Sequence, residues 1–377
     1  MTGRSGRSAV RVLALSAGLT AVAAGWSLPA PAWLRLLAGA LTAGTAWSLL
    51  RVLLAAAAAV GAVLRGRPPR PVLVGGALLA LLAAGVGGPG PVARAAGPGI
   101  DVAAALAVTP EPVLRSGQPG SLVDRTGLGY EGRAFVDAGR SGVSALTARA
   151  YVGIGHASDE AERVQLAVEE WIRLGGLEHA VVLVAAPTGS GWVDRGAVAA
   201  AERAAGGDLV TVVVQYADRP SALEHLLGGD RSARVTTELA RGLRAVLDTR
   251  PAEQRPRLVL FGESLGAAAV EQAAATVDVD GCLAAGAPGG ATTPGGATSS
   301  GGTAGCRAVH NADDPVSWWS PRLLLARPEE LPWLPVVTFW QVTAELAVSL
   351  DQPPGHGHSY GDALAPAWAQ LLGPGAG

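Results

Sequence analysis

The chain has 377 residues, of which 49% are hydrophobic, and it carries a formal net charge of −2 at pH 7. This length is enough for more than one domain with a buried core, and the near-zero charge gives no electrostatic reason to expect nucleic acid as a partner. The sequence contains no lysine, which excludes a Schiff-base lysine, a Ser-Lys dyad and a P-loop lysine.

The first part of the chain has the composition of a membrane region. An arginine-bearing start is followed by three apolar stretches that are nearly free of charge. Each approaches or exceeds the roughly 20 residues that a bilayer requires, and a signal peptide alone would not explain the second and third. We therefore predict a transmembrane region over residues 1–90, with spans at 9–28, 33–64 and 71–90. The middle span is over-long and contains Arg51, so the number of spans stays open.

The arginines also predict an orientation. The N-terminus and the turn at residues 65–70 are both arginine-rich, and basic loops remain on the cytoplasmic side of a membrane. A third span then places everything after about residue 91 on the outer face. Residues 91–147 begin in a Gly/Pro-rich stretch and mix short apolar pieces with turn signals, so we treat them as a linker without firm structure.

The chain has two cysteines, Cys282 and Cys306, and no Cys-x-x-Cys motif, so neither a zinc knuckle nor a redox dithiol is supported. On the outer face these cysteines would lie in an oxidising compartment, where a disulfide could close the segment between them. The alternative is a pair of unpaired buried thiols.

From about residue 148 onward, apolar stretches of strand length alternate with helical patterns. Strands are expected at 148–154, 180–186, 209–215, 257–261, 281–286 and 306–310, and helices at 158–174 with Ser158 as N-cap, from about 196, and at 236–247, 267–276 and 362–372. Apolar strands separated by helices predict a parallel sheet covered on both faces, with ligands bound beyond the carboxyl ends of its strands. We assign residues 148–377 to this α/β domain, with the Gly/Thr/Ser-rich segment 286–305 as a flexible loop.

One of these strands runs into a motif that suits a nucleophile. Residues 257–261 lead into Gly262-Glu-Ser-Leu-Gly266, and an alanine-rich helix pattern follows at once. This order of strand, sharp turn and helix is the context of a nucleophile elbow, in which a strained backbone at Ser264 projects its Oγ above the sheet. The flanking glycines would remove Cβ atoms that so tight a turn cannot accommodate. The pattern is weak by itself in a chain with 52 glycines, so a base, an acid and an oxyanion loop must complete it.

A base is expected downstream of the serine. Three histidines follow Ser264, and His310 comes too early, at the end of the last strand, so we take it as structural. His356 and His358 lie in a glycine-rich loop before the C-terminal helix, where a chain order of serine, acid and histidine places the base. We favour His358, which is nearer the helix, over His356. The alternatives are two surface histidines or, less favoured because no third ligand is nearby, a metal pair.

The acid should follow the strand that precedes the histidine loop. The stretch from Asn311 to Pro315 occupies that position, and Asp314, fixed ahead of the proline, is the preferred residue. Asp313 is the second choice and Asp280 the third. The carboxylate would hold the imidazole tautomer and stabilise the imidazolium. The structural alternative is an Asx-type turn before the proline.

An oxyanion hole needs two backbone N–H groups directed at the developing negative charge. One would be the amide of Leu265, the residue after the nucleophile. The other is expected in the glycine-rich loop after strand 180–186, where Thr188 and Gly189 are the favoured positions. A plain strand-to-helix turn would explain the same loop.

Aromatic side chains gather between the acid and the histidines, namely Trp318, Trp319, Trp333, Phe339 and Trp340. They would suit a wall for an apolar acyl chain, although packing of a helix onto the core explains them equally well.

Five blocks follow one another in the chain, namely Thr188-Gly-Ser-Gly-Trp-Val-Asp, Phe261-Gly-Glu-Ser-Leu-Gly, Asp314-Pro-Val-Ser-Trp-Trp-Ser-Pro, Pro335-Val-Val-Thr-Phe-Trp-Gln-Val and Pro354-Gly-His-Gly-His-Ser-Tyr-Gly. Together they resemble those of an actinobacterial-type family of membrane-anchored α/β-hydrolases. The resemblance covers roughly residues 125–365. It implies a serine esterase or lipase-like enzyme without a cofactor, and it assigns Ser264, Asp314 and one of the paired histidines to the triad. The segment 287–304 is shorter than in such relatives, which leaves the shape of the pocket open.

The sequence therefore predicts a membrane-anchored serine hydrolase that cleaves a carboxylic ester of lipidic character at the outer face, through an acyl-enzyme. Its expected partners are the membrane and a lipid or other apolar ester. An acyltransferase of envelope lipids would use the same residues with an alcohol in place of water. A non-catalytic lipid-binding or envelope-assembly protein is the third hypothesis.

Overall fold

A computed structural model describes residues 30–45, 47, 99–138, 147–218, 230–288, 305–327, 331 and 333–373. The chain divides into two compact units. The N-terminal unit comprises Met1–Ala95 and Trp319–Val348, and the sheet unit comprises Ala96–Trp318 and Ser349–Gly377. The segment 319–348 is therefore an insertion that leaves the sheet unit and returns to it.

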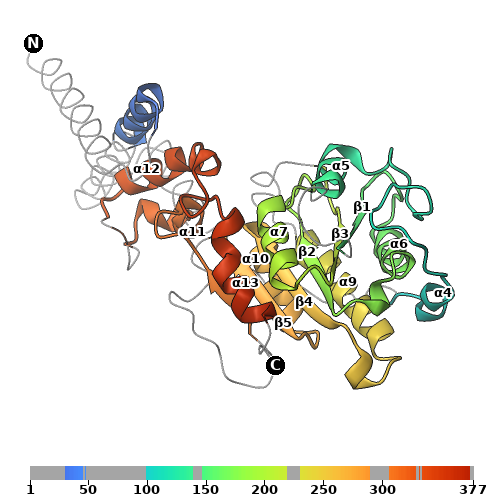
Figure 1. Cartoon of the computed structure of the whole chain (residues 1–377). Helices are drawn as coiled ribbons and strands as arrows, with labels where there is room; N and C mark the ends of the chain where they lie inside the picture. The colour runs from blue at the N-terminus through green and yellow to red at the C-terminus, as the bar shows by residue number, and fades with distance from the viewer. Residues whose placement is uncertain are drawn as a thin grey trace, which may run out of the picture. The chain divides into compact units, whose positions relative to one another are not determined.

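The sheet unit is built on parallel strands (Figure 1). They are β1 Ala148–Val152, β2 Val181–Ala186, β3 Leu209–Val214, β4 Arg257–Glu263, β5 Gly281–Ala285 and β6 Arg307–Val309. Their order across the sheet is β1-β3-β2-β4-β5-β6. β3 thus lies on one side of β2, and β4 lies on the other side. A change of direction of this kind opens a crevice at the carboxyl ends of the strands. The predicted parallel sheet and each of its strands are confirmed, with small shifts at their ends.

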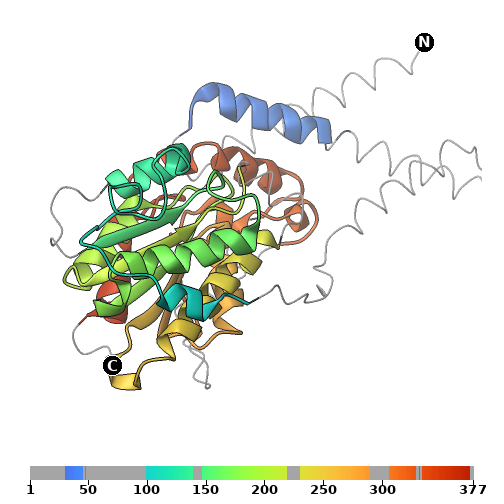
Figure 2. The same ribbon diagram turned by 90° about the vertical axis from the view of Figure 1, so that its right-hand side faces the viewer.

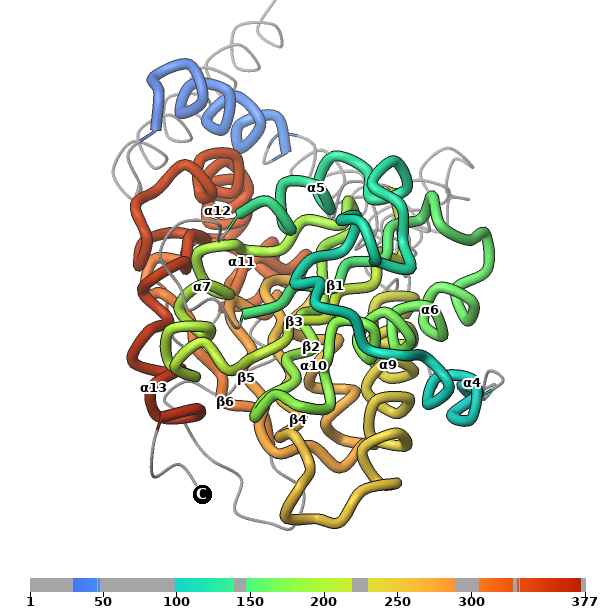
Figure 3. The backbone as a smooth tube through the Cα atoms, turned by 45° about the vertical axis from the view of Figure 1, so that its right-hand side comes forward, coloured from blue at the N-terminus to red at the C-terminus, as the bar shows by residue number. Residues whose placement is uncertain are grey.

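Helices cover both faces of the sheet. The α-helices of this unit are α4 Val102–Leu106, α5 Gly129–Asp137, α6 Glu160–Arg173, α7 Arg195–Ala204, α9 Arg231–Leu247, α10 Leu265–Ala274, α11 Pro315–Trp318 and α13 Ala365–Leu372, and the short 3₁₀ helices are η1 Gly176–Glu178, η2 Ala252–Gln254, η5 Ser349–Asp351 and η6 Gly361–Leu364. α6, α9 and α10 pack against one another and against the strands on one face. α7 and α13 pack together on the opposite face (Figures 2 and 3). There, Trp368 of α13 contacts Phe261 of β4.

Two helix boundaries differ from the sequence prediction. Asp159, rather than Ser158, is the N-cap of α6, because its side chain accepts hydrogen bonds from the N–H groups of Ala161 and Glu162. A carboxylate at this position also interacts favourably with the helix dipole. α9 begins at Arg231, five residues before the predicted start at 236, since the polar first turn of that helix carries too few apolar residues to reveal its period.

The segment before the sheet belongs to the sheet unit and has its own structure. α4 packs against α6 and α9, and α5 packs against β1. Buried Glu170 of α6 accepts hydrogen bonds from the hydroxyls of Ser116 and Ser121, both at 2.7 Å, and from Leu122 N–H at 2.8 Å. These contacts hold residues that the sequence left as an unstructured linker.

A disulfide joins Cys282 and Cys306. Cys282 lies in β5, and Cys306 directly precedes β6, the neighbouring strand. Of the two alternatives that the sequence left open, the disulfide is the one found. The loop that it closes, residues 289–304, lies outside the described residues.

The N-terminal unit contains a helix over residues 32–45, the 3₁₀ helix η4 Pro321–Leu324 and α12 Val337–Leu346. Trp340 of α12 donates its indole N–H to the hydroxyl of Thr45, at 2.9 Å. Within the described ranges, no helix is both long enough and apolar enough to cross a bilayer. The predicted spans 9–28 and 71–90 and most of 33–64 fall outside those ranges.

Candidate active site

The connection from β4 to α10 is the sharp turn that the sequence predicted. Ser264 has φ 58° and ψ −122°, a conformation that residues with a side chain rarely adopt. A Cβ atom on Gly262 would lie 2.0 Å from the carbonyl oxygen of Gly266, and one on Gly266 would lie 2.5 Å from that of Ala186. The predicted strain at the serine and the need for both glycines are confirmed.

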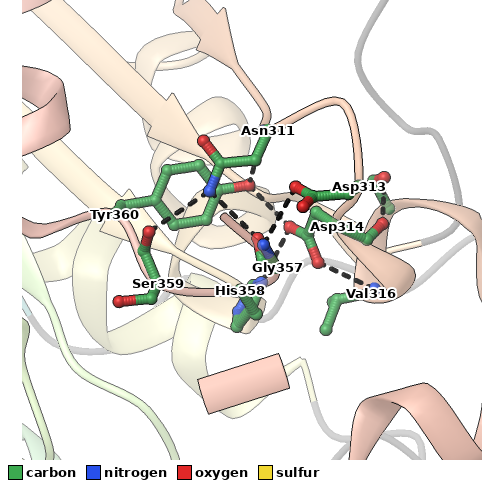
Figure 4. A network of polar contacts seen from close by, with 9 residues as sticks. Asn311, Asp313, Asp314, Val316, Gly357, His358, Ser359 and Tyr360 are labelled. Atoms are coloured by element: carbon green, nitrogen blue, oxygen red, sulfur yellow. Dashed lines mark hydrogen bonds and ion pairs between the residues drawn. The ribbon is translucent and has the colours of Figure 1, made fainter. Parts of the chain in front are cut away.

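Asp314 and His358 form a buried contact, which we call the inner pair (Figure 4). His358 Nδ1 lies 2.8 Å from Asp314 Oδ2, and the two side chains are 6% and 0% exposed. Tyr360 donates its hydroxyl to the same oxygen at 2.6 Å, and Val316 N–H donates to Oδ1 at 2.9 Å. One carboxyl oxygen thus faces the imidazole while the other holds the turn after Pro315. Asp314 thus makes both the imidazole contact expected of an acid and the turn contact expected before a proline.

The hydrogen bond to Asp314 also sets the tautomer of His358. A carboxylate only accepts, so the shared proton belongs to Nδ1, and in the neutral imidazole the lone pair is then on Nε2. Nε2 is buried and has no hydrogen-bond partner among the described residues. The main-chain N–H of His358 donates to Ser349 O at 3.0 Å, which fixes the loop. The imidazole is therefore held so that it can accept a proton.

The elbow and the inner pair lie at the same rim of the sheet. Ser264 N–H donates to Ala285 O at 3.0 Å, at the end of β5. The next residue, Gly286, has φ 57°, and a Cβ atom there would lie 2.7 Å from His358 Cε1 and 2.8 Å from Asp314 Oδ2. No hydrogen bond joins Ser264 Oγ to His358 Nε2 in this structure. Such catalytic contacts are often unmade until substrate binds.

A second acid–imidazole contact, which we call the outer pair, lies one step away in the same two loops. His356 Nδ1 is 3.1 Å from Asp313 Oδ2, and the side chains are 65% and 27% exposed. Gly357 N–H donates to Asp313 Oδ1 at 2.9 Å. The Asn311 amide donates to Gly357 O at 2.9 Å and to Ser359 O at 3.2 Å. The outer pair and Asn311 thus tie the two loops together around the inner pair.

The two predicted oxyanion positions differ in what their amides do. Leu265 begins α10, so its N–H is among the first four of the helix, which have no intrahelical acceptor. Thr188 N–H, by contrast, donates to Trp192 O at 2.9 Å. That bond closes the loop on itself and occupies the amide, which argues against the main chain of Thr188 as a donor. Gly189 is then the better candidate in this loop.

Glu263, the residue before the nucleophile, is a buried acid that the sequence did not single out. It is 4% exposed, and neither of its carboxyl oxygens has a hydrogen-bond partner among the described residues. Burial raises the pKa of Glu263 well above its usual value, and the negative charges of Asp194 and Asp314, together with a side-chain interaction with Asp194, act in the same direction. The surroundings therefore favour the neutral form of the carboxyl group that directly precedes Ser264.

Asp194 links the oxyanion loop to the histidine loop. Its Oδ1 caps α7 by accepting from the N–H groups of Gly196 and Ala197, at 2.8 and 3.0 Å. Its Oδ2 accepts from Gly361 N–H at 2.8 Å, at the start of η6. The N-terminus of α7 and the segment after His358 are therefore held by one side chain.

Several other expected residues lie elsewhere. Asp280, the third choice of acid, precedes β5 and binds Arg244 at 2.8 Å and Leu258 N–H at 2.7 Å. It therefore lies at the amino end of the strands, opposite the elbow. Trp318 ends α11 in the sheet unit, whereas the other four aromatic residues belong to the N-terminal unit. Their role as a pocket wall stays a prediction. Within the described ranges, no three His, Cys, Asp or Glu side chains are grouped as metal ligands.

Sequence reasoning missed the support of the inner pair. Tyr360 was visible only as part of a short motif, and its hydroxyl reaches Asp314 because the loop folds back after His358. Asn311 and Asp194 act through main-chain groups that no pattern marks in advance. Glu263 carried one signal, since it directly follows an apolar run and precedes the serine, and a charged residue is rarely buried.

The comparison with known families agrees with this arrangement. No curated protein and no solved structure matches the chain. The model of the alpha/beta-hydrolase family matches residues 148–300 and 302–376, which is more than half of the chain and includes the elbow and both acid–imidazole pairs. The actinobacterial type and the membrane anchoring that the sequence suggested are not addressed by this match. On this match and this fold, the chain belongs to the alpha/beta-hydrolase family.

Proposed function

We propose that this hydrolase is a serine esterase in which Ser264 is the nucleophile, His358 the base and Asp314 the acid. The observation that carries the proposal is the inner pair, in which a buried imidazole is held by Asp314 and Tyr360 while its Nε2 remains unpartnered beside the elbow. The alternative base, His356, is mostly exposed and bound to Asp313. Asp314 and His358 are therefore favoured over Asp313 and His356.

The reaction follows from these positions. His358 Nε2 removes the proton from Ser264 Oγ as the oxygen attacks the ester carbonyl carbon. The N–H groups of Leu265 and Gly189 stabilise the oxyanion. The tetrahedral intermediate then breaks its bond to the alkoxy oxygen, which takes the proton from His358 and leaves as the alcohol. Water, deprotonated by His358, attacks the acyl-enzyme, and the carboxylic acid and free Ser264 result.

The proposed location is the outer face of the cell membrane, with a multi-pass N-terminal region as anchor and a lipid or other apolar ester as substrate. The arginine distribution of residues 1–70 supports this orientation. The Cys282–Cys306 disulfide supports it independently, because disulfides persist in oxidising compartments. Protease protection in sealed spheroplasts tests it, since a sheet unit that is protected until lysis would contradict an outer location.

Labelling with a fluorophosphonate probe tests the chemistry. The full-length protein in detergent should form a covalent adduct, and mass spectrometry should find it on the peptide that spans residues 256–277. Ser264→Ala should abolish both labelling and hydrolysis of a short p-nitrophenyl ester. Ser190→Ala, which removes the hydroxyl 3.4 Å from that of Thr188 in the oxyanion loop, is the matched control and should keep both. An unlabelled wild-type protein would favour a lipid-binding role instead.

An added acceptor alcohol distinguishes hydrolysis from acyl transfer. With water alone, a hydrolase should release acid and alcohol in equal amounts. If a transesterified product dominates when the acceptor is added at low concentration, the enzyme is an acyltransferase that uses the same acyl-enzyme.

A further inference from the structure

The insertion 319–348 connects the two acid–imidazole loops to the N-terminal unit. The chain leaves the sheet unit after Trp318, at the end of the short helix α11 that follows Asp314. It returns at Ser349, whose carbonyl oxygen accepts the main-chain N–H of His358 at 3.0 Å. The segment between these two points thus belongs to the same compact unit as residues 1–95.

The helix over residues 32–45 is apolar on both of its faces. Leu34, Ala38 and Thr42, spaced four residues apart, are buried. The opposite face exposes Trp33, Leu36, Leu37 and Leu41, with exposed fractions of 65%, 60%, 49% and 41%. Arg35 is the one charged residue in this helix. A surface helix in water normally has a polar outer face, and a helix that is apolar all round is one surrounded by protein or by lipid.

The second half of the insertion has the same character, whereas its first half carries Arg322, Arg327, Glu329 and Glu330. Between Trp333 and Val348, Glu345 is the one charged residue, and it is buried. Leu325 and Leu334 are 69% and 53% exposed. Phe339 contacts both Trp319 and Trp340, with ring centroids 6.1 and 5.0 Å apart, in a tilted and an edge-to-face arrangement. Tryptophan indoles with one hydrogen-bonded edge and one apolar body are the side chains that gather where lipid meets water.

We propose that the exposed apolar side chains of the N-terminal unit (Trp33, Leu36, Leu37, Leu41, Leu325 and Leu334) bind the acyl chains of a phospholipid bilayer. The insertion that joins the acid and base loops would then be seated in the membrane surface. Six of the eleven large apolar side chains found exposed among the described residues belong to this small unit. Such a concentration on a monomer marks a protein or membrane contact. A bilayer is favoured because residues 1–95, which belong to the same unit as the insertion, contain no acidic residue and are mostly apolar between their nine arginines.

The membrane contact also bears on the substrate of the proposed esterase, and this part of the inference rests on that proposed function. An insertion seated among acyl chains has its two ends in the loops that carry Asp314 and His358. A bilayer lipid ester would therefore lie in the same membrane as the segment that joins these two loops, whereas a short soluble ester would need no membrane contact. The expected substrate class is a membrane-resident ester with at least one long acyl chain.

Site-specific fluorescence quenching tests the membrane contact in the full-length protein. The two native cysteines are bonded to each other, so Leu325→Cys or Leu334→Cys introduces a single free thiol for a bimane label. Tyr130→Cys is the matched control, because Tyr130 of α5 is 76% exposed but belongs to the sheet unit. In phosphatidylcholine proteoliposomes that contain acyl-brominated lipid, labels at 325 and 334 should lose emission, and the label at 130 should not.

Two other results would overturn the proposal. In the first, the labels at 325 and 334 keep their emission, and the unlabelled thiols there react with a membrane-impermeant maleimide as fast as the thiol at 130. This result would show that the surface faces water. Thiols that are protected from maleimide but give no quenching would show that protein covers the surface, and a crosslink between two copies through the thiol at 334 would identify a second copy of the chain.

An activity measurement separates this proposal from the proposed function. The Leu325→Glu/Leu334→Glu double variant should lose turnover of a long-chain ester held in vesicles and keep turnover of a soluble p-nitrophenyl ester. Equal turnover of both esters would overturn the link to the substrate. If the wild-type protein hydrolyses neither ester, the esterase assignment fails, while the quenching result remains valid for the membrane contact.

Discussion

The inner and outer pairs contain the same two residue types and lie one step apart in the same two loops, yet their surroundings differ. The inner pair is 6% and 0% exposed and shares its carboxyl group with Tyr360 and Val316 N–H. The outer pair is 65% and 27% exposed. Water competes for every hydrogen bond of the outer pair, and an exposed pair of this kind contributes about 0–1 kcal/mol.

This difference shows how a site can assign separate roles to duplicated residues. Where water is excluded, the acid orients an imidazole and leaves one nitrogen for chemistry. Where water enters, the same contact can still hold a loop, as Asp313 does through Gly357 N–H. The outer pair is therefore expected to position the loop and the inner pair to carry the reaction, which makes matched substitutions in the two pairs informative.

The largest expected effect comes from the two histidines. His358→Gln should lower kcat on a short ester by about 10⁶-fold, since loss of the base leaves only binding and the oxyanion hole. His356→Gln should change kcat by less than about 10-fold, because its side chain is exposed and its loop is also held by Asn311. Steady-state kinetics of the purified variants measure both. The reverse ranking would show that His356 is the base.

Substitution of the two aspartates should follow the same ranking, and the loss of kcat at Asp314 should be smaller than the loss at His358. Asp314→Asn should lower kcat by about 10⁴-fold, because an amide in place of the carboxylate favours the wrong imidazole tautomer. Asp313→Asn keeps an acceptor for Gly357 N–H and should retain most of the activity. Circular dichroism should show that both variants are folded. Equal losses in the two variants would mean that burial does not distinguish the pairs.

How far the sequence could lead is visible in these same residues. Ser264 was predictable because strand, glycine-flanked serine and helix are consecutive, so that the elbow is encoded locally. Asp314 and His358 were predictable as positions after a strand and before a helix. The preference for His358 over His356 rested only on distance from the helix, whereas the physical distinction is that His358 is buried and packs edge-on against Tyr360.

Other features depend on contacts that no local pattern contains. The hydrogen bond of Trp340 to Thr45 joins residues far apart in the chain, so the assignment of the insertion to the N-terminal unit could not be read from periodicity. α5 contains two glycines, and its apolar residues show little helical periodicity. It is stabilised by packing on β1. Thr188 was a reasonable oxyanion donor until its amide was found bound to Trp192 O.

Tyr360→Phe should have an intermediate effect, since it removes one donor of the inner pair and leaves the acid and base in place. Burial, then the charge of Asp314, raises the pKa of Tyr360, so its hydroxyl stays protonated and donates to Asp314. A hydrogen bond to a charged group contributes about 1.5–3 kcal/mol. We expect kcat to fall by about 10- to 100-fold and thermal stability to decrease. Tyr130→Phe, on the exposed face of α5, should change neither quantity.

Glu263→Gln should have the smallest effect on activity and a distinct effect on the pH dependence of stability. Asp314 is buried with donors on both oxygens, whereas Glu263 is buried with none among the described residues. Its raised pKa means that, above its ordinary value of 4.5, the native state keeps a proton that the unfolded state releases. The free energy of unfolding should therefore fall by up to about 1.4 kcal/mol per pH unit from there to the native pKa.

Glutamine is neutral at every pH, so the variant should lack this slope, and its stability relative to the wild type should rise with pH. Denaturant unfolding across a pH series measures the difference. Glu271→Gln in α10 is the matched control, because burial also raises the pKa of Glu271 but far more of that side chain meets water, so its curve should differ less from that of the wild type. Parallel curves for Glu263→Gln and the wild type would show that Glu263 is ionised in the native state. In that case the buried carboxylate of Glu263 would be ionised without any hydrogen-bond donor. Burial alone would then not explain why the buried carboxylate of Asp314 has Tyr360 as a donor while the exposed outer pair has no such donor.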